Sequence, residues 1–321
     1  MLDLRRYNGI LLKKRKSTRV LYNEDKNTGQ RIKTMQDRVS PSGVRDILQT
    51  QAIFPKKKLG QNFLVDRNIL VKIADSCDIN DRQYLLEIGP GLGSLTQELA
   101  WRSRGVLAVE LDTRLEPLLR DLARESGNIK LLFGDILKLD IEAEMDKAFQ
   151  EPTLDAYKVC ANIPYNITTP IIFKLLEQCP RMDSATLMMQ KEVGKRLTAV
   201  PGNKDYGRLT IMAAYYAQVD LIMHVSRSCF YPRPEVDSVV IKMTPRQQPI
   251  APVHNEKVLK DFVNAAFQKR RKTILNIASG FFGINKADAQ ANIEELGLQS
   301  TLRPEDLSLA EIIMLVNRFI P

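Results

Sequence analysis

A short segment with two oxygen acceptors and an aromatic ring follows a predicted buried strand. Asn162-Ile163-Pro164-Tyr165 comes shortly after an apolar run that ends at Val159. A proline disfavours helix in the residue before it and lacks a backbone donor, so the chain must leave the sheet here. In open α/β sheets, the carboxyl ends of the strands bind ligands. The Asn162 amide oxygen and the Ile163 carbonyl oxygen, beside the Tyr165 ring, suit an exocyclic amine on a planar base.

The same segment also has a purely structural interpretation. Turns that contain a proline often carry an asparagine that bonds to nearby backbone, and an aromatic residue can simply cover the core. Both interpretations are open for this segment alone. The glycines and acids upstream of it favour the first.

A glycine-rich turn lies between a predicted strand and a predicted helix. Gly89, Gly91 and Gly93 would let the backbone approach a ligand closely. The dinucleotide-binding fingerprint would place its third glycine at position 94, which is Ser94 here, and no P-loop lysine follows. The turn therefore favours a nucleotide-like ligand that has no pyrophosphate.

Acidic side chains lie at the ends of three successive predicted strands. Glu87 ends the first and Glu110 the second, where a carboxylate can accept from ribose hydroxyls. Asp135 follows the third strand, where it can accept from an adenine amine. Three acids suit a ligand with adenine, ribose and positive charge but no phosphates. S-adenosylmethionine fits that description and NAD does not, which argues against an oxidoreductase.

Predicted strands alternate with predicted helices through the first two-thirds of the chain. The strands are residues 84–88, 106–110, 129–133, a run that ends at 159, and 185–189. Helical patterns cover residues 41–50, a stretch that begins at Asp66, 95–101 and 115–123. This alternation predicts an α/β fold with a parallel sheet that helices cover on both faces.

The pattern changes after about residue 245. A proline-rich linker spans residues 245–252. Beyond it only helical periodicity is present, at 258–278, 286–296 and 309–319, with Ser308 and Glu311 as a possible helix start. We expect the α/β domain at residues 35–245 and a small all-helical domain at 246–321.

The composition, with 44% apolar and 26% charged residues among 321, is that of an ordinary globular protein. No apolar run reaches the ~18–20 residues of a membrane span, and no signal peptide is apparent. The four cysteines lack CxxC spacing and the two histidines lie far apart. We therefore expect a cytoplasmic protein without a metal site, a histidine triad or a membrane partner, and we expect a monomer.

The net charge of +9 is concentrated near the start of the chain. Residues 1–34 contain ten basic and three acidic residues, which leaves a net charge of only +2 for residues 35–321. We expect residues 1–34 to be a disordered basic extension. They could contact RNA phosphates, or translation could begin at Met35. A nucleic-acid hypothesis has to rest on local clusters.

Five motifs together resemble a known family. Glu87–Gly93, Gly134-Asp135 and Asn162–Tyr165 resemble motifs of the Rossmann-type methyltransferases that modify adenine amines. Leu59–Leu64 and Phe230–Ser238 narrow the resemblance to the ribosomal RNA adenine dimethyltransferases, closest to the KsgA family of the small subunit. The likeness runs from about residue 36 to the C-terminus and leaves residues 1–34 outside.

The resemblance implies a Rossmann-like fold, S-adenosylmethionine as cofactor, and N6,N6-dimethylation of two adjacent adenosines near the 3′ end of 16S rRNA. It also implies a role in small-subunit biogenesis, with small-subunit rRNA and the pre-30S particle as partners. The cofactor residues would be Asn62, Leu64, Gly89, Gly91, Glu110, Asp135 and Asn162. The catalytic residues would be Asn162, Ile163, Pro164, Tyr165 and Phe230. Tyr165 would stack on one face of a flipped adenine and Phe230 on the other, although Phe230 could instead be a loop anchor.

Basic clusters indicate where RNA could bind. The candidate RNA-binding residues are Lys56, Lys57, Lys58, Lys269, Arg270, Arg271 and Lys272. A run of charged residues usually forms a solvent-exposed face. The second cluster, however, falls within the predicted helix 258–278, whose apolar positions would pack against the protein. The basic residues of this helix would then be free to bind phosphates. Two alternatives share these motifs: a large-subunit dimethyltransferase of the macrolide-resistance type, and a non-catalytic RNA-binding assembly factor.

Overall fold

The computed structural model describes residues 38–56, 59–150, 154–268 and 271–320. The described residues belong to one compact unit, and the other unit, Met1–Thr34, lies outside them. The predicted disorder of residues 1–34 therefore falls outside the described part of the chain. The predicted domain division at residue 245 stays a prediction.

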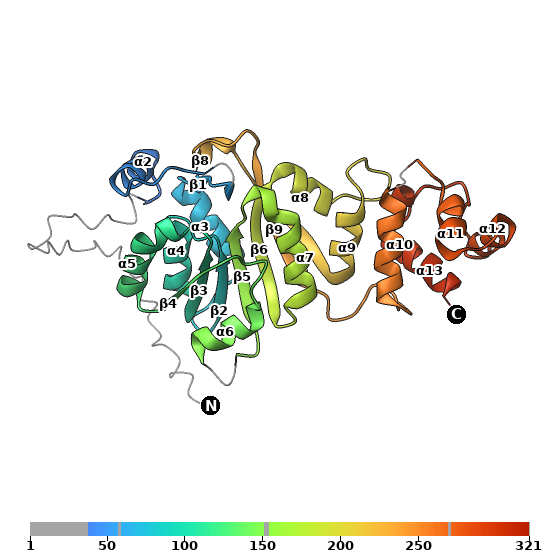
Figure 1. Ribbon diagram of the computed structural model, residues 1–321, viewed down its shortest axis with the longest axis horizontal. Coiled ribbons are helices and arrows are strands. Elements are labelled where there is room, and N and C mark those ends of the chain that lie inside the picture. Colours follow the sequence, from blue (N-terminus) through green and yellow to red (C-terminus); the bar gives the residue numbers. More distant parts are fainter. Residues whose placement is uncertain (1–37, 57–58, 151–153, 269–270, 321) are drawn as a thin grey trace, which may run out of the picture. The chain divides into compact units, whose positions relative to one another are not determined.

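A seven-stranded sheet with the order β4-β3-β2-β5-β6-β9-β7 forms the centre of the fold (Figure 1). Its parallel strands are β2 (Tyr84–Ile88), β3 (Gly105–Glu110), β4 (Ile129–Phe133), β5 (Tyr157–Asn162) and β6 (Met182–Gln190). These five confirm the five predicted strands. The sequence pattern missed the antiparallel edge, which is β9 (Ser238–Pro245) and β7 (Ala217–Val225).

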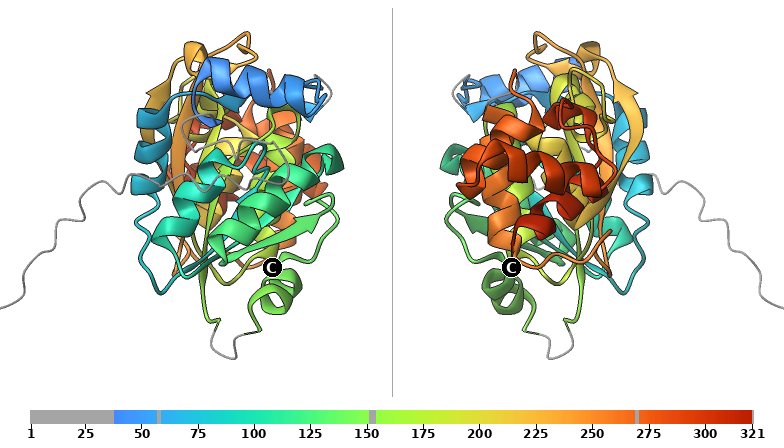
Figure 2. Two further views of the ribbon diagram at one scale, coloured as in Figure 1. Left: turned by 90° about the vertical axis from the view of Figure 1, so that its left-hand side faces the viewer. Right: turned by 90° about the vertical axis from the view of Figure 1, so that its right-hand side faces the viewer.

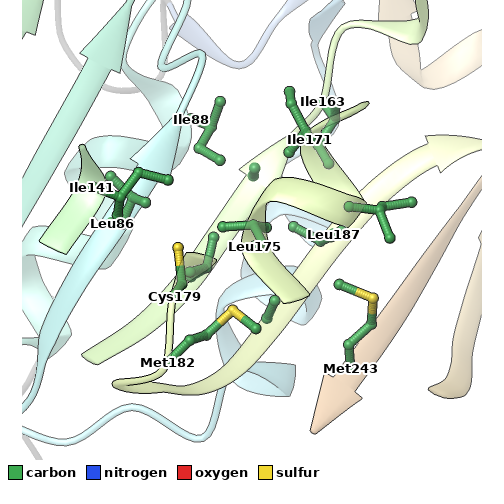
Figure 3. Packing of buried hydrophobic residues seen from close by; sticks show 14 of the residues in the cluster. Leu86, Ile88, Ile141, Ile163, Ile171, Leu175, Cys179, Met182, Leu187 and Met243 are labelled. Atoms are coloured by element: carbon green, nitrogen blue, oxygen red, sulfur yellow. The ribbon is translucent and has the colours of Figure 1, made fainter. Parts of the chain in front are cut away.

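Helices cover both faces of the sheet, as predicted. One face carries α3 (Arg67–Ser76), α4 (Ser94–Arg102) and α5 (Glu116–Ser126), and the other α6 (Ile141–Phe149), α7 (Thr168–Gln178), α8 (Lys191–Leu197) and α9 (Arg208–Tyr216). Successive strand residues alternate between the two cores: Leu86 packs on the second face and Leu85 on the first. Figure 3 shows α7 residues Ile171 and Leu175 in the second core.

Short elements complete the α/β part. Helix α2 (Pro41–Thr50) matches the helix expected at residues 41–50, and β1 (Phe63–Leu64) pairs antiparallel with β8 (Phe230–Tyr231). The 3₁₀ turns of this part include η2 (Thr113–Leu115), η3 (Tyr165–Ile167) and η4 (Arg227–Cys229), and a further turn, η5 (Pro304–Asp306), lies near the C-terminus. No helix in the described ranges is both long and apolar enough to cross a membrane.

Side-chain caps fix where two predicted helices begin. Asp66 Oδ1 accepts from Asn68 N at 2.9 Å and Ile69 N at 3.2 Å, so α3 starts at the expected residue. Ser308 and Glu311 form a capping box at the start of α13 (Leu309–Phe319), which confirms the predicted start signal.

The C-terminal helices differ from the prediction at one place. The predicted helix 258–278 is two helices, α10 (Glu256–Gln268) and α11 (Ile274–Phe282). Ile274 N donates to Leu302 O at 2.8 Å instead of to a carbonyl one turn earlier, and Thr273 caps the new helix. The prediction of one continuous helix was therefore wrong.

The remaining C-terminal helices are α12 (Lys286–Glu295) and α13, grouped with α10 and α11 in Figure 2. Their apolar cluster also includes Ile211 and Met212 of α9, and Tyr206 donates its hydroxyl to Leu307 O at 2.8 Å. The C-terminal helices thus share a core with a helix that also covers the sheet.

Helix α8 packs against β9 with no room for a side chain at Gly194. A Cβ there would lie 2.2 Å from Val239 Cγ2, and a β-branched side chain cannot easily turn aside. We predict that Gly194→Ala lowers the free energy of unfolding by about 1–3 kcal/mol in urea denaturation.

Gly280 in α11 provides a matched control. A Cβ there would have nothing within 4 Å, so Gly280→Ala should be neutral or stabilising by up to about 1 kcal/mol. An equal loss of stability in both variants would contradict the steric explanation.

Candidate active site

One cavity of about 210 Å³ lies at the carboxyl ends of the central strands. All seven predicted cofactor residues line it: Asn62, Leu64, Gly89, Gly91, Glu110, Asp135 and Asn162. They come from five separate segments of the chain, near β1 and at the ends of β2, β3, β4 and β5. The parallel register of β2, β3, β4 and β5 brings four of these segments together, because these strands end at the same edge of the sheet.

The glycine turn forms one wall of the cavity. Gly89, Gly91 and Gly93 have φ values of +72°, +57° and +80°, a backbone conformation that strains other residues. A Cβ at Gly93 would also lie 2.5 Å from Leu122 Cδ2. The turn therefore keeps its backbone exposed to the cavity while it joins β2 to α4.

Glu110 lies at the end of β3 and is 7% exposed. Its two carboxylate oxygens accept from Gly91 N at 3.1 Å and from Asp112 N at 2.8 Å. Burial raises the pKa of this carboxyl, and the backbone donors oppose that effect. A carboxylate oxygen has more than one lone pair, so Glu110 can still accept from a ligand hydroxyl.

Asp135 is half-buried after β4, and its Oδ1 accepts from Leu137 N at 3.0 Å. This bond holds the Asp135 carboxylate, which lines the cavity, in one orientation. Asp135 therefore presents acceptor atoms at the same edge of the sheet as Glu110.

Glu87 is buried among the cavity-lining residues and is 1% exposed. Its Oε2 has no hydrogen-bond partner in the part of the chain that the structure describes. Burial raises the pKa of this carboxyl to about 8. The carboxyl is therefore mainly protonated at neutral pH, and a positive charge placed beside it would favour its ionised form.

Asn162 and Asn62 interact directly. Asn162 Nδ2 donates to the Asn62 carbonyl at 3.2 Å, and Asn62 Nδ2 donates to the Gly60 carbonyl at 3.1 Å. Since the donor end of the Asn162 amide is used in this way, its Oδ1 is the acceptor that remains at the cavity. Ile163 has a buried side chain, and its N–H donates to Met188 O at 3.0 Å.

The two predicted stacking rings lie beside the cavity instead of in its lining. The described lining includes Asn162 and Pro164 but not Ile163, Tyr165 or Phe230. Phe230 is 3% exposed and pairs with Leu64 across β1 and β8. Tyr165 is half-buried, and its hydroxyl lies 2.6 Å from Ser238 Oγ.

Only three of the predicted RNA-binding residues fall within the described ranges. Lys56 is exposed on the segment that leads into the cavity wall. Arg271 and Lys272 are exposed between α10 and α11, and not on a helix as the sequence pattern predicted. Lys57, Lys58, Lys269 and Arg270 lie outside the described residues.

Gln61 and Asp112 form a link that sequence analysis missed. Gln61 Nε2 donates to Asp112 Oδ2 at 2.8 Å, and its Oε1 accepts from Lys56 N at 2.9 Å. Arg114 Nε also donates to Asp112, at 2.8 Å, and this pair lowers the pKa of the Asp112 carboxyl. In the sequence, the only sign of this link was the position of Asp112, an acid two residues after Glu110.

Within the described ranges, no group of three or more potential metal ligands occurs.

Comparisons with known proteins agree on one family. The sequence model described as "Ribosomal RNA adenine dimethylase" matches residues 54–320. A Bacillus cytotoxicus protein named "Ribosomal RNA small subunit methyltransferase A" is 41% identical over 290 residues, which cover 89% of this chain and 99% of that protein. A Bacillus cereus protein of the same name is 40% identical over 289 residues, with 89% and 98% covered.

Two solved structures are similar to this chain over most of their own length. A dimethyladenosine transferase from Plasmodium falciparum is 28% identical with a TM-score of 0.66, covering 78% of this chain and 95% of that one. The 23S rRNA methyltransferase ErmE is 28% identical with a TM-score of 0.62, covering 80% and 99%. These likenesses confirm the predicted Rossmann-like methyltransferase fold.

The buried carboxyl of Glu87 predicts a pH dependence of stability. Its pKa rises on folding from an ordinary 4.5 to about 8. Between these values the unfolded chain loses a proton that the folded chain keeps, so wild-type stability falls as pH rises through this window. Glu87→Gln has no such proton to lose.

We therefore predict that Glu87→Gln gains stability relative to wild type as pH rises from about 4.5 to about 8, by at most about 1.4 kcal/mol per pH unit. The difference should level off above that window. Urea denaturation of both proteins across this pH range measures it. A difference that stays constant with pH would show that the carboxyl does not titrate in this way.

Proposed function

Because the chain belongs to the ribosomal RNA adenine dimethylase family, we propose that it dimethylates N6 of two adjacent adenosines near the 3′ end of small-subunit (16S) rRNA. The chain is an S-adenosylmethionine-dependent methyltransferase that acts on ribosomal RNA. The observation that favours the small subunit is the 41% identity to a small-subunit methyltransferase along 99% of that relative.

The residues around the cavity fit the cofactor. Three carboxyls, from Glu87, Glu110 and Asp135, line it, which suits a ligand with a positive charge and ribose hydroxyls and no phosphates. We assign Glu110 to the ribose hydroxyls and Asp135 to the adenine amine. S-adenosylmethionine, when bound, supplies a methyl group that is activated by a positively charged sulfur.

Asn162 and Ile163 would hold the nitrogen that receives the methyl group. The N6 lone pair of adenine is delocalised into the ring, which makes the nitrogen a poor nucleophile. Asn162 Oδ1 and the Ile163 carbonyl, as acceptors for its two N–H groups, favour a pyramidal and more nucleophilic nitrogen. They also stabilise the positive charge that develops on it, so no general base is required for the attack. In-line positioning contributes much of the remaining acceleration.

The aromatic residues would hold the flipped base. We assign Tyr165 and Phe230 to its two faces, with each contact worth roughly 1–3 kcal/mol against unstacking. Phe230 belongs to the β1–β8 pair and is 3% exposed, so its contact with the base requires this short pair to shift when RNA binds. Pro164 shapes the turn between the acceptors and Tyr165.

The RNA surface would extend outward from the cavity. Lys56, Arg271 and Lys272 are exposed cations on two segments outside regular helices and strands, and we assign them, with Lys57, Lys58, Lys269 and Arg270, to RNA phosphates. Recognition of a folded RNA by shape and phosphates suits such a set. We propose that the enzyme acts as a monomer on the pre-30S particle in the cytoplasm.

A large-subunit substrate is the second candidate. The likeness to the 23S rRNA methyltransferase ErmE, with a TM-score of 0.62, favours it, but the small-subunit relatives are more similar in sequence. Primer extension on both rRNAs, from cells with and without the gene, separates the two candidates. The proposal predicts gene-dependent stops near the 3′ end of 16S rRNA. Stops only in 23S rRNA would contradict it.

The role assigned to Asn162 gives a direct test. We predict that Asn162→Ala lowers kcat by about 10²–10³-fold, as loss of a transition-state acceptor should. Cofactor affinity should fall by less than about tenfold, because the other lining residues remain. Methyl incorporation and calorimetric titration measure the two effects.

Asn68→Ala is a suitable control, because Asn68 is exposed in the first turn of α3. It should change neither turnover nor cofactor affinity. Normal turnover in Asn162→Ala would refute the assigned role.

A further inference from the structure

A pair of hydroxyl groups connects the turn after β5 to a strand two positions away in the sheet. Tyr165 Oη and Ser238 Oγ lie 2.6 Å apart. Tyr165 begins η3 after β5, and Ser238 is the first residue of β9. Strand β6 lies between β5 and β9, so the tyrosine side chain extends across the end of β6.

Ser238 is held rigidly in the sheet. It is 0% exposed, and its register pairs it with Gln190 of β6 on one side and Val225 of β7 on the other. The carbonyl of the preceding residue, Asp237, accepts from Lys191 N at 3.0 Å. The Ser238 hydroxyl therefore occupies a fixed position that cannot shift without disturbing two strand pairings.

The backbone end of Tyr165 is held as well. A Cβ at Gly60 would lie 3.2 Å from Tyr165 N and 3.5 Å from Pro164 Cβ, so the Leu59–Leu64 segment packs closely on this turn. Thr168 Oγ1 donates to the Pro164 carbonyl at 3.3 Å. Burial raises the pKa of the Tyr165 phenol, so its hydroxyl stays protonated and available for the bond at neutral pH.

We propose that Ser238 is a positioning residue for methyl transfer, which holds the Tyr165 ring at the angle at which the target adenine stacks on it. This inference rests on the role proposed above for Tyr165. A ring fixed at both ends is ordered before the base arrives, so no further side-chain entropy is lost on stacking. N6 then meets the methyl group in line in a larger fraction of complexes.

A double-mutant cycle distinguishes this role from a purely structural one. Ser238→Ala and Tyr165→Phe each remove one hydroxyl of the pair, and the second variant keeps the ring. We predict that each lowers kcat on unmodified small ribosomal subunits by about tenfold. Because both break the same bond, the double variant should also lose about tenfold instead of a hundredfold.

Binding measurements supply a second readout. The dissociation constants for S-adenosylmethionine and for small subunits should change by less than about twofold, because the phosphate contacts and the cofactor residues are intact. Ser103→Ala is the matched control. It removes another buried serine hydroxyl, one whose Oγ has no hydrogen-bond partner in the described ranges, and it should leave kcat unchanged.

Two results would overturn the inference: single-variant losses that multiply in the double variant, or single variants with wild-type kcat. If Ser238→Ala does not fold, Tyr165→Phe still tests the same bond, and a wild-type kcat for it contradicts the role of Ser238. A wild-type enzyme that does not methylate small subunits would instead overturn the proposed function, and this inference with it.

Discussion

One hydrogen bond orients the side-chain amide at the carboxyl end of β5: Asn162 Nδ2 donates to the Asn62 carbonyl at 3.2 Å. A primary amide has a donor end and an acceptor end. With the donor end turned to Asn62, the acceptor end remains at the cavity, where a nucleobase amine can donate to it. A rotated amide would present N–H groups to an amine that also donates. The polarity of the site thus depends on a backbone carbonyl 100 residues earlier in the sequence.

The segment that carries this carbonyl contacts three other parts of the site. Leu64 pairs with Phe230 across β1 and β8, and Gln61 donates to Asp112 beside the carboxylate of Glu110. Gly60 packs closely on the turn that carries Tyr165. The residues assigned to the cofactor and those assigned to the target base therefore share one support.

The sequence predicts well whatever depends on local chemistry. Strand ends follow from apolar runs, the glycine turn from its spacing, and the starts of α3 and α13 from caps at Asp66 and Ser308. The strand ends and the glycine turn also place five of the seven cofactor candidates at one edge of the sheet. The family resemblance added Asn62 and Leu64, for which spacing alone gave no role.

Features that depend on distant partners were not predictable. The predicted helix 258–278 is interrupted before Ile274, whose N–H donates to Leu302 O, a partner that periodicity does not reveal. The hydrogen bond between Tyr165 and Ser238 joins residues 73 positions apart in the sequence. Phe230 is buried where it pairs with Leu64, which is also distant in the sequence. Each of these depends on a long-range contact that forms only when the sheet and its loops are assembled.

The most direct test of the central claim is a structure of the enzyme with S-adenosylhomocysteine and an RNA that carries the target adenosine. The account predicts that N6 lies within about 3.2 Å of both Asn162 Oδ1 and the Ile163 carbonyl, a usual hydrogen-bond length, while Asn162 Nδ2 stays on the Asn62 carbonyl. An Asn162 amide turned away from the base, with N6 held by other residues, would contradict it.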